Sequence, residues 1–153
     1  MTRVLISLLL GLCAVAALAD EALDPKVVAE AMRQLQQPAE KVRELALHGC
    51  DSAATADRRG CTQYWLISSD LAMSDLLRQL VADRSGRPQQ KLLQESQRAW
   101  LAFRDAACQF EVSGYASGPQ ASLESLQCLK TATDTRNAQL QGYASCTAGA
   151  ACP

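Results

Sequence analysis

Six cysteines between residues 50 and 152 restrict the fold of this chain more than any other feature. They are Cys50, Cys61, Cys108, Cys128, Cys146 and Cys152; a seventh lies in an apolar N-terminal segment. An even number of cysteines in an exported chain predicts disulfides, here three. A zinc site is disfavoured because no C-x-x-C pair occurs and His48 is the chain's one imidazole. We therefore expect no metal ion and no cofactor.

Residues 1–19 have the pattern of a secretory signal peptide. Arg3 supplies a positive charge, an uncharged apolar run follows, and Ala17 and Ala19 are the small residues that precede a cleavage site. The apolar run is shorter than the ~20 residues that cross a bilayer, so we expect no membrane span after cleavage. The mature chain would begin at Asp20 and be periplasmic or secreted.

The charge of the mature chain argues against two classes of partner. Of the 15 basic and 16 acidic side chains, only Arg3 lies in residues 1–19, so cleavage leaves a net charge of about −2. This balance does not indicate binding to nucleic acid or to an anionic lipid surface. The remaining length suits one domain with a modest core.

Apolar residues recur at helical spacing along most of the chain. Asp24 and Pro25 predict the start of a first helix, Pro38 separates it from a second, and Gly49 ends that one. Residues 50–60 are polar and turn-rich. Longer helices are predicted over residues 61–82, 89–112 and 120–141. No segment alternates long enough to predict a strand, so the fold class is all-α, an antiparallel helical bundle stapled by disulfides.

These segments divide the chain into four expected parts. They are a signal peptide (1–19), an N-terminal helical extension (20–49), a cysteine-containing helical domain (50–142) and a cysteine-containing tail (143–153). Within the 89–112 helix, a stripe at approximately helical spacing is expected to cover the core. Its members are Leu93, Trp100, Phe103, Ala107 and Phe110.

The disulfide pairing has two candidate arrangements. Residues equally far from a helix–helix turn lie at the same height, and a turn near residue 85 places Cys61 opposite Cys108. This favours Cys61–Cys108, with Cys50–Cys128 and Cys146–Cys152. The alternative pairs near neighbours, Cys50 with Cys61 and Cys108 with Cys128. Six cysteines allow fifteen pairings, so the sequence leaves the choice open.

The stretch "QRAWLAFRDAAC" carries a resemblance to a known family. Gln97, Arg98, Trp100, Arg104, Asp105 and Cys108 resemble the hallmark helix of the LprI N-terminal-like domain family. Cys50 and Cys61 resemble the first cysteine pair of that family, and Cys128 resembles its fourth cysteine. The closing segment is matched by Thr133, Arg136 and Leu140, and the resemblance covers residues 50–141. One departure is Ala72, which stands where the family often has an asparagine.

The resemblance implies an exported helical protein that inhibits a lysozyme-type glycosidase, for example a c-type lysozyme. Such an inhibitor acts by contact and is not an enzyme. On the residues themselves, Tyr115 and Glu111 are the candidate partner contacts. A glycosidase is disfavoured because Glu95 and Glu111 lie ~24 Å apart on one helix, whereas glycosidase carboxylates lie ~5–9.5 Å apart. The alternative is a structural or assembly module of the cell envelope that binds another protein.

Overall fold

The computed structural model describes residues 23–115 and 117–146. These residues form five α-helices and one 3-10 turn, without a strand, which confirms the predicted all-α class. The expected signal peptide and Cys152 lie outside the described residues. The elements are α2 (Pro25–Leu35), α3 (Ala39–His48), the 3-10 turn η1 (Gly49–Asp51), α4 (Thr55–Asp83), α5 (Pro88–Glu111) and α6 (Pro119–Ala144).

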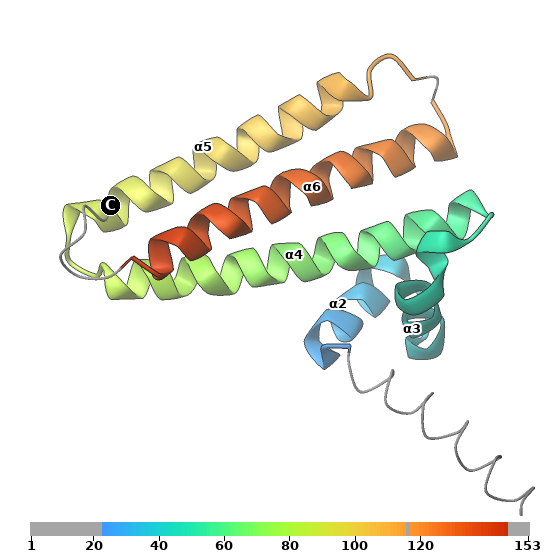
Figure 1. Cartoon of the computed structure of the whole chain (residues 1–153), viewed down its shortest axis with the longest axis horizontal. Helices are drawn as coiled ribbons and strands as arrows, with labels where there is room; N and C mark the ends of the chain where they lie inside the picture. Colours follow the sequence, from blue (N-terminus) through green and yellow to red (C-terminus); the bar gives the residue numbers. More distant parts are fainter. Residues whose placement is uncertain (1–22, 116, 147–153) are drawn as a thin grey trace, which may run out of the picture.

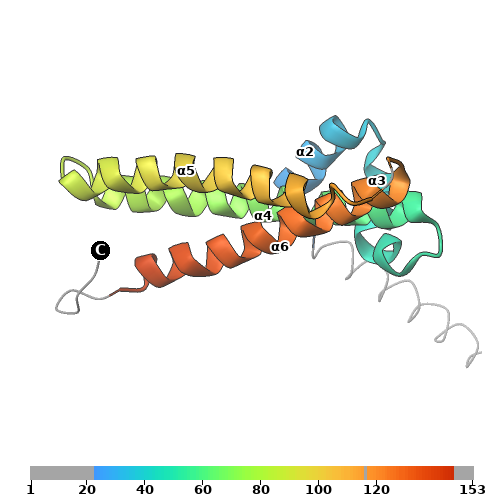
Figure 2. The same ribbon diagram turned by 90° about the horizontal axis from the view of Figure 1, so that it is seen from above.

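Three long helices form an antiparallel bundle, and two short ones cover one end of it (Figure 1). α4 and α6 pack against each other along most of their lengths, whereas α5 makes fewer contacts and makes more of them with α6 than with α4. Seen from above, α6 is offset from the α4–α5 layer at one end and approaches it at the other (Figure 2). α2 and α3 lie beside the N-terminal half of α4.

The core has two parts, one on each half of α4. The first joins α2 and α3 to the start of α4 and contains Leu23, Val27, Val28, Ala31, Val42, Ala46, Tyr64 and Ile67. The second lies between the three long helices and contains Met73, Leu80 and Leu140, with Trp100 and Leu101 of α5 packed against it. The first core explains why the predicted N-terminal extension docks on the bundle.

α4 begins six residues earlier than its predicted start at Cys61. The Ser52 hydroxyl accepts a hydrogen bond from the Ala54 amide (3.1 Å) and donates one to Asp57 (3.0 Å), so the first turn is anchored by polar side chains. Gly60 ends no helix: a Cβ there would lie 2.8 Å from Leu45, so this glycine allows α3 to approach α4 closely. The prediction of a turn over 50–60 is therefore wrong for residues 55–60.

The disulfides follow the alternative pairing. Cys50 bonds to Cys61 and Cys108 bonds to Cys128, with Cα–Cα distances of 5.3 and 5.6 Å. The first arrangement, with Cys61–Cys108 and Cys50–Cys128, is wrong. The turn that aligns two cysteines is the α5–α6 connection, since residue 118 is the midpoint of Cys108 and Cys128. Cys146 is disulfide-bonded, but the expected pairing with Cys152 extends beyond the described residues.

The face of α5 that contacts the bundle also differs from the prediction. Phe103 and Phe110 are 68% and 78% exposed, so their placement in the core is wrong. The contacting face contains Leu93, Gln97, Trp100, Arg104 and Cys108, spaced three or four residues apart. The contacting face therefore includes the polar residues Gln97 and Arg104, which the periodicity argument did not place there, and it lacks Phe103 and Phe110.

Within residues 23–115 and 117–146, no helix combines the length and the apolar character that crossing a membrane requires.

Candidate functional site

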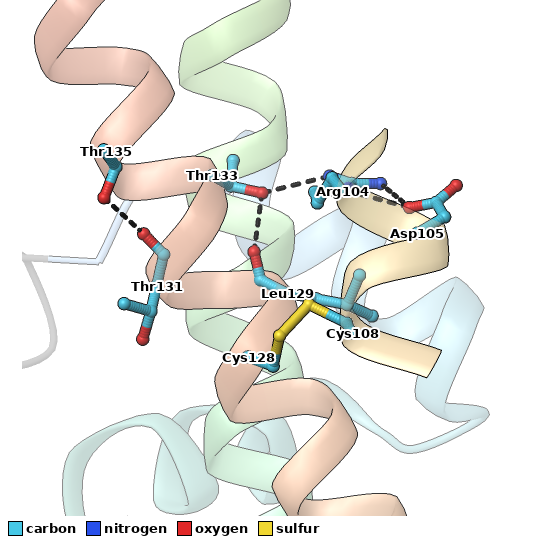
Figure 3. Close-up of a disulfide and its surroundings, with 8 residues drawn as sticks. All are labelled: Arg104, Asp105, Cys108, Cys128, Leu129, Thr131, Thr133 and Thr135. Atoms are coloured by element: carbon cyan, nitrogen blue, oxygen red, sulfur yellow. Dashed lines mark hydrogen bonds and ion pairs between the residues drawn. A yellow bond between two sulfur atoms is a disulfide. The ribbon is translucent and has the colours of Figure 1, made fainter. Parts of the chain in front are cut away.

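Arg104 of α5 links all three long helices. Its guanidinium donates hydrogen bonds to Asp70 of α4 and to Thr133 of α6, both at 3.0 Å. It also contacts Asp105 at 2.9 Å, and Figure 3 shows the contacts with Thr133 and Asp105. Thr133 is fully buried, and its hydroxyl also donates to the Leu129 carbonyl at 2.8 Å. Arg104 of the motif thus fixes α5 to its neighbours, whereas the exposed Asp105 contacts Arg104 on α5 itself.

Asp70 is held in this network at an electrostatic cost. Burial raises the pKa of its carboxyl, and the Arg104 charge opposes that shift only in part. The Arg104 guanidinium therefore favours the ionised form of a partly buried carboxylate between two helices.

Arg136 of α6 forms a second polar link one helical turn away from Thr133. The residue is 5% exposed, and its Nε donates to Gln97 Oε1 at 3.0 Å. Gln97 is buried too, and its Nε2 donates to Met73 Sδ at 3.2 Å, so the chain of contacts crosses from α6 through α5 to α4. Burial lowers the pKa of the Arg136 guanidinium.

Trp100 lies close to two guanidinium groups. Arg104 and Arg136 lie 5.4 and 5.7 Å from the centre of its ring, within cation–π range. The ring also packs against the second core part. Gln97, Trp100, Arg104 and Asp105 of the predicted motif therefore take part in one polar network, whereas Arg98 lies on the exposed side of α5.

A hollow of about 380 Å³ lies beside this network, at the α5–α6 end of the bundle. It brings together the two predicted contact residues, Glu111 and Tyr115, with Glu124 of α6, which the sequence analysis missed. Glu124 lies one helical turn before Cys128, and that spacing is the signal that could have identified it. The hollow is lined by Glu111, Val112, Tyr115, Glu124, Gln127, Cys128, Thr131 and Ala132.

The Cys108–Cys128 disulfide positions the walls of the hollow. Cys128 lines it directly, and Cys108 is buried one turn before Glu111. The Tyr115 amide donates to the Val112 carbonyl at 3.0 Å, which folds the loop back, and the Tyr115 side chain is 50% exposed. The Gln120 side-chain Nε2 donates to Glu124 Oε1 at 2.6 Å. Two carboxylates and a phenol ring thus surround a space that suits a cationic side chain.

The part of the chain that the structure describes holds no group of three or more His, Cys, Asp or Glu residues placed to bind a metal ion.

Comparison with known proteins identifies the family. Residues 50–140 match the family described as "Lysozyme inhibitor LprI", which is more than half of the chain. The chain belongs to the LprI family. The resemblance inferred from the "QRAWLAFRDAAC" stretch is therefore confirmed. Both described disulfides, the polar network and the hollow lie inside the matched LprI segment.

One curated relative is similar over a shorter stretch. It is the "Uncharacterized protein YecT" of Escherichia coli (strain K12), 44% identical over 59 residues. The match covers 36% of this chain and 36% of that relative, so it spans about a third of the relative's length. No solved structure matches the chain.

The polar network leads to a first prediction, which concerns the energetic coupling between Gln97 and Arg136. Arg136→Met is expected to destabilise the fold by about 2 kcal/mol, because Gln97 Oε1 loses its buried donor. In the Arg136→Met protein, Gln97→Leu should lower the unfolding free energy by less than it does in the wild type. The difference, which is the coupling energy, should be about 1 kcal/mol. Urea unfolding of the two single variants and the double variant measures it. Strict additivity would show that the 3.0 Å contact does not link the two side chains energetically.

Proposed function

We propose that this protein is an exported inhibitor of a lysozyme-type glycosidase, which it binds by contact and without chemistry of its own. The family to which it belongs carries the inhibitor description. The observation that supports the contact site is the hollow at the α5–α6 end, where Glu111 and Glu124 flank Tyr115. Disulfides persist in oxidising compartments, which supports export to the periplasm or the exterior.

The chemistry of the hollow suits a basic partner. A lysozyme-type enzyme depends on a cleft with two carboxylates, and an inhibitor needs only to cover that cleft. A cationic side chain at the cleft rim would enter between Glu111 and Glu124 and stack on the Tyr115 ring. With a net charge of about −2 for the mature chain, long-range attraction is small, so these local contacts carry the affinity.

Rigidity of the surface supports the same function. Tyr115 follows a helix that a disulfide ties to α6, and the loop folds back through the Tyr115–Val112 hydrogen bond. A preorganised aromatic anchor loses little conformational entropy on binding. The disulfide and the turn hydrogen bond therefore restrict the conformations open to the surface before it meets a partner.

The direct test uses the oxidised mature protein and a c-type lysozyme. We expect a complex on size-exclusion chromatography and slower lysis of cell walls at micromolar inhibitor. Unchanged lysis with no complex would refute inhibition. A pull-down from periplasmic extract that instead recovered a non-enzymatic envelope protein would favour the alternative, a structural or assembly module.

A second prediction locates the contact at the hollow. Glu111→Lys is expected to weaken lysozyme binding by about tenfold or more, because it places a like charge against a basic partner. Tyr115→Ala should weaken it by a similar factor through loss of the aromatic anchor. Isothermal titration calorimetry measures both.

Asp83→Lys is the matched control for Glu111→Lys. Asp83 is exposed at the end of α4, at the opposite end of the bundle, and the substitution makes the same change of net charge. Its lysozyme affinity should stay within about twofold of wild type. Equal losses for Asp83→Lys and Glu111→Lys would mean that net charge, and not the hollow, governs binding.

A further inference from the structure

A second hollow lies where α2 and α3 pack against the first turns of α4. Its volume is about 290 Å³, and its lining residues come from segments 35–45 and 56–63. It shares no residue with the hollow at the α5–α6 end, and none with the polar network around Arg104. The inhibitor function proposed above therefore makes no use of it.

Arg59 of α4 brings a positive charge to this second hollow without a compensating acidic group. The residue is half-buried, and its Nε is buried without a hydrogen-bond partner in residues 23–115 and 117–146. Within the same residues, no ion pair involves its guanidinium. A partly desolvated cation that lacks a counter-charge has an electrostatic cost. An anion bound in the second hollow would offset that cost.

The other charged side chains that line the second hollow are already paired. The Lys41 ammonium lies 3.2 Å from Glu44 and 3.7 Å from Asp57. The Asp57 carboxylate also accepts a hydrogen bond from the Ser52 hydroxyl at 3.0 Å. The charge that remains for a ligand is therefore that of Arg59, and it favours an anionic ligand.

The rest of the lining narrows the class of anion. Gln37 and Gln63 each bring a side-chain amide, which carries both a donor and an acceptor. Leu35 and Leu45 bring apolar side chains. A planar carboxylate suits a guanidinium, because two parallel N–H···O bonds can form between them. An amide and a short aliphatic group next to that carboxylate would match the remaining lining.

We infer that the second hollow binds the C-terminal carboxylate of a peptide whose last residue is aliphatic. Arg59 receives the carboxylate, the two glutamine side chains bind the last peptide bond, and the two leucines contact the aliphatic side chain. Ligand pockets have volumes of about 300–1,000 Å³, so the second hollow is small and holds a single terminal residue. The affinity is accordingly weak, with a dissociation constant in the millimolar range, because few atoms are in contact.

The position of the second hollow separates it from the property that names the family. Four of its nine lining residues precede residue 50, where the match to the LprI family begins. The site is therefore built jointly by the N-terminal helices and the LprI segment. A bound ligand would contact both, and would link α2 and α3 to α4.

The probe for the test is N-acetyl-L-leucine, which carries one carboxylate, one amide and one isobutyl group. It is titrated up to about 50 mM into the isotopically labelled, oxidised mature protein. Backbone amide resonances of residues 35–37, 41–45 and 56–63 should shift. Shifts that are absent from these segments, or that fall only elsewhere, overturn the proposal.

Two further compounds test which groups of the probe are recognised. N-acetyl-L-leucinamide has nearly the same shape without the negative charge, and it should bind about tenfold more weakly or worse. Acetate has the charge without the amide and the isobutyl group, and it should also bind about tenfold more weakly or worse. Equal binding of the leucinamide would show that no carboxylate is recognised, and equal binding of acetate would show that any small anion suffices. Either result overturns the assignment.

Arg59→Gln and Arg78→Gln form a matched pair of variants. Each removes one positive charge from α4, but Arg78 is exposed, is paired with Asp75 at 2.9 Å and does not line the second hollow. Arg59→Gln should weaken binding of N-acetyl-L-leucine by about tenfold or more, whereas Arg78→Gln should stay within about twofold of wild type. Circular dichroism of both variants checks that they are folded. Unchanged affinity in folded Arg59→Gln protein would refute the role of Arg59.

Discussion

Protein with both Cys108 and Cys128 replaced by alanine is expected to lose about 3 kcal/mol of unfolding free energy. The bond closes a 20-residue segment, and its main effect in the chain-entropy description is to restrict the unfolded chain. The loss is large against the stability of a domain of this size, which is of order 10 kcal/mol. Urea unfolding at neutral pH, followed by circular dichroism, measures it.

The same variant should lose lysozyme affinity beyond what instability explains. Cys128 lines the hollow, and Cys108 holds the end of α5 from which Glu111 and Tyr115 follow. The Cys50–Cys61 pair provides the matched control: its loop of 11 residues gives a similar entropic effect of about 3 kcal/mol, but it lies outside the hollow.

Lysozyme binding, measured at urea concentrations well below the unfolding transition, distinguishes the effects of the two disulfides on affinity. Cys108→Ala/Cys128→Ala should bind about tenfold more weakly than wild type, because the loop loses its fixed position. Cys50→Ala/Cys61→Ala should bind as wild type does. Equal affinities for the two double variants would exclude a role for the Cys108–Cys128 bond in shaping the contact surface.

Local signals in the sequence were sufficient to predict where most of the helices begin and end. Asp24 accepts a hydrogen bond from the Lys26 amide at 2.8 Å, and Pro25 and Pro88 occupy first-turn positions, as their chemistry predicts. Gly60 misled the prediction because a glycine in a polar stretch indicates a turn, whereas here it admits Leu45 of another helix. The reason for that glycine is a tertiary contact that no local pattern contains.

The inner face of α5 shows a second limit of prediction from sequence periodicity. Periodicity ranks Phe103 and Phe110 above Gln97 and Arg104 for burial, because burial of polar groups has a cost. Gln97 is nevertheless buried, since Arg136 and Met73 provide partners from two other helices. The spacing of residues 97, 100, 104 and 108 places all four on one face of the helix. A buried polar network on that face is the interpretation that accounts for this spacing.

The sequence predicted only the part of the candidate site that lies at the C-terminal end of α5. Glu111 and Tyr115 are close in sequence, so local reasoning placed them together. Glu124 reaches the same hollow because the Cys108–Cys128 bond aligns α6 with α5, and this pairing was open at the level of sequence.

Trp100→Ala is expected to destabilise the fold by about 3 kcal/mol. Removing the ring takes away packing against the core part formed by Met73, Leu80 and Leu140. It also removes two cation–π contacts of about 0.5–1 kcal/mol each and leaves the Arg104 and Arg136 guanidinium groups facing a void. Trp100→Phe should lose only about 1 kcal/mol, because a smaller ring retains a face for both cations.

The other tryptophan of the chain is the control. Trp65 is 37% exposed, its indole donates to the Ala46 carbonyl at 3.3 Å, and within the described residues no cation lies over its ring. Trp65→Ala should therefore cost about half as much as Trp100→Ala. If Trp100→Ala were no more destabilising than Trp65→Ala, the contacts of the Trp100 ring with Arg104 and Arg136 would not contribute measurably to holding α5 against α6. Urea unfolding of the three variants, with the wild type alongside, decides between these outcomes.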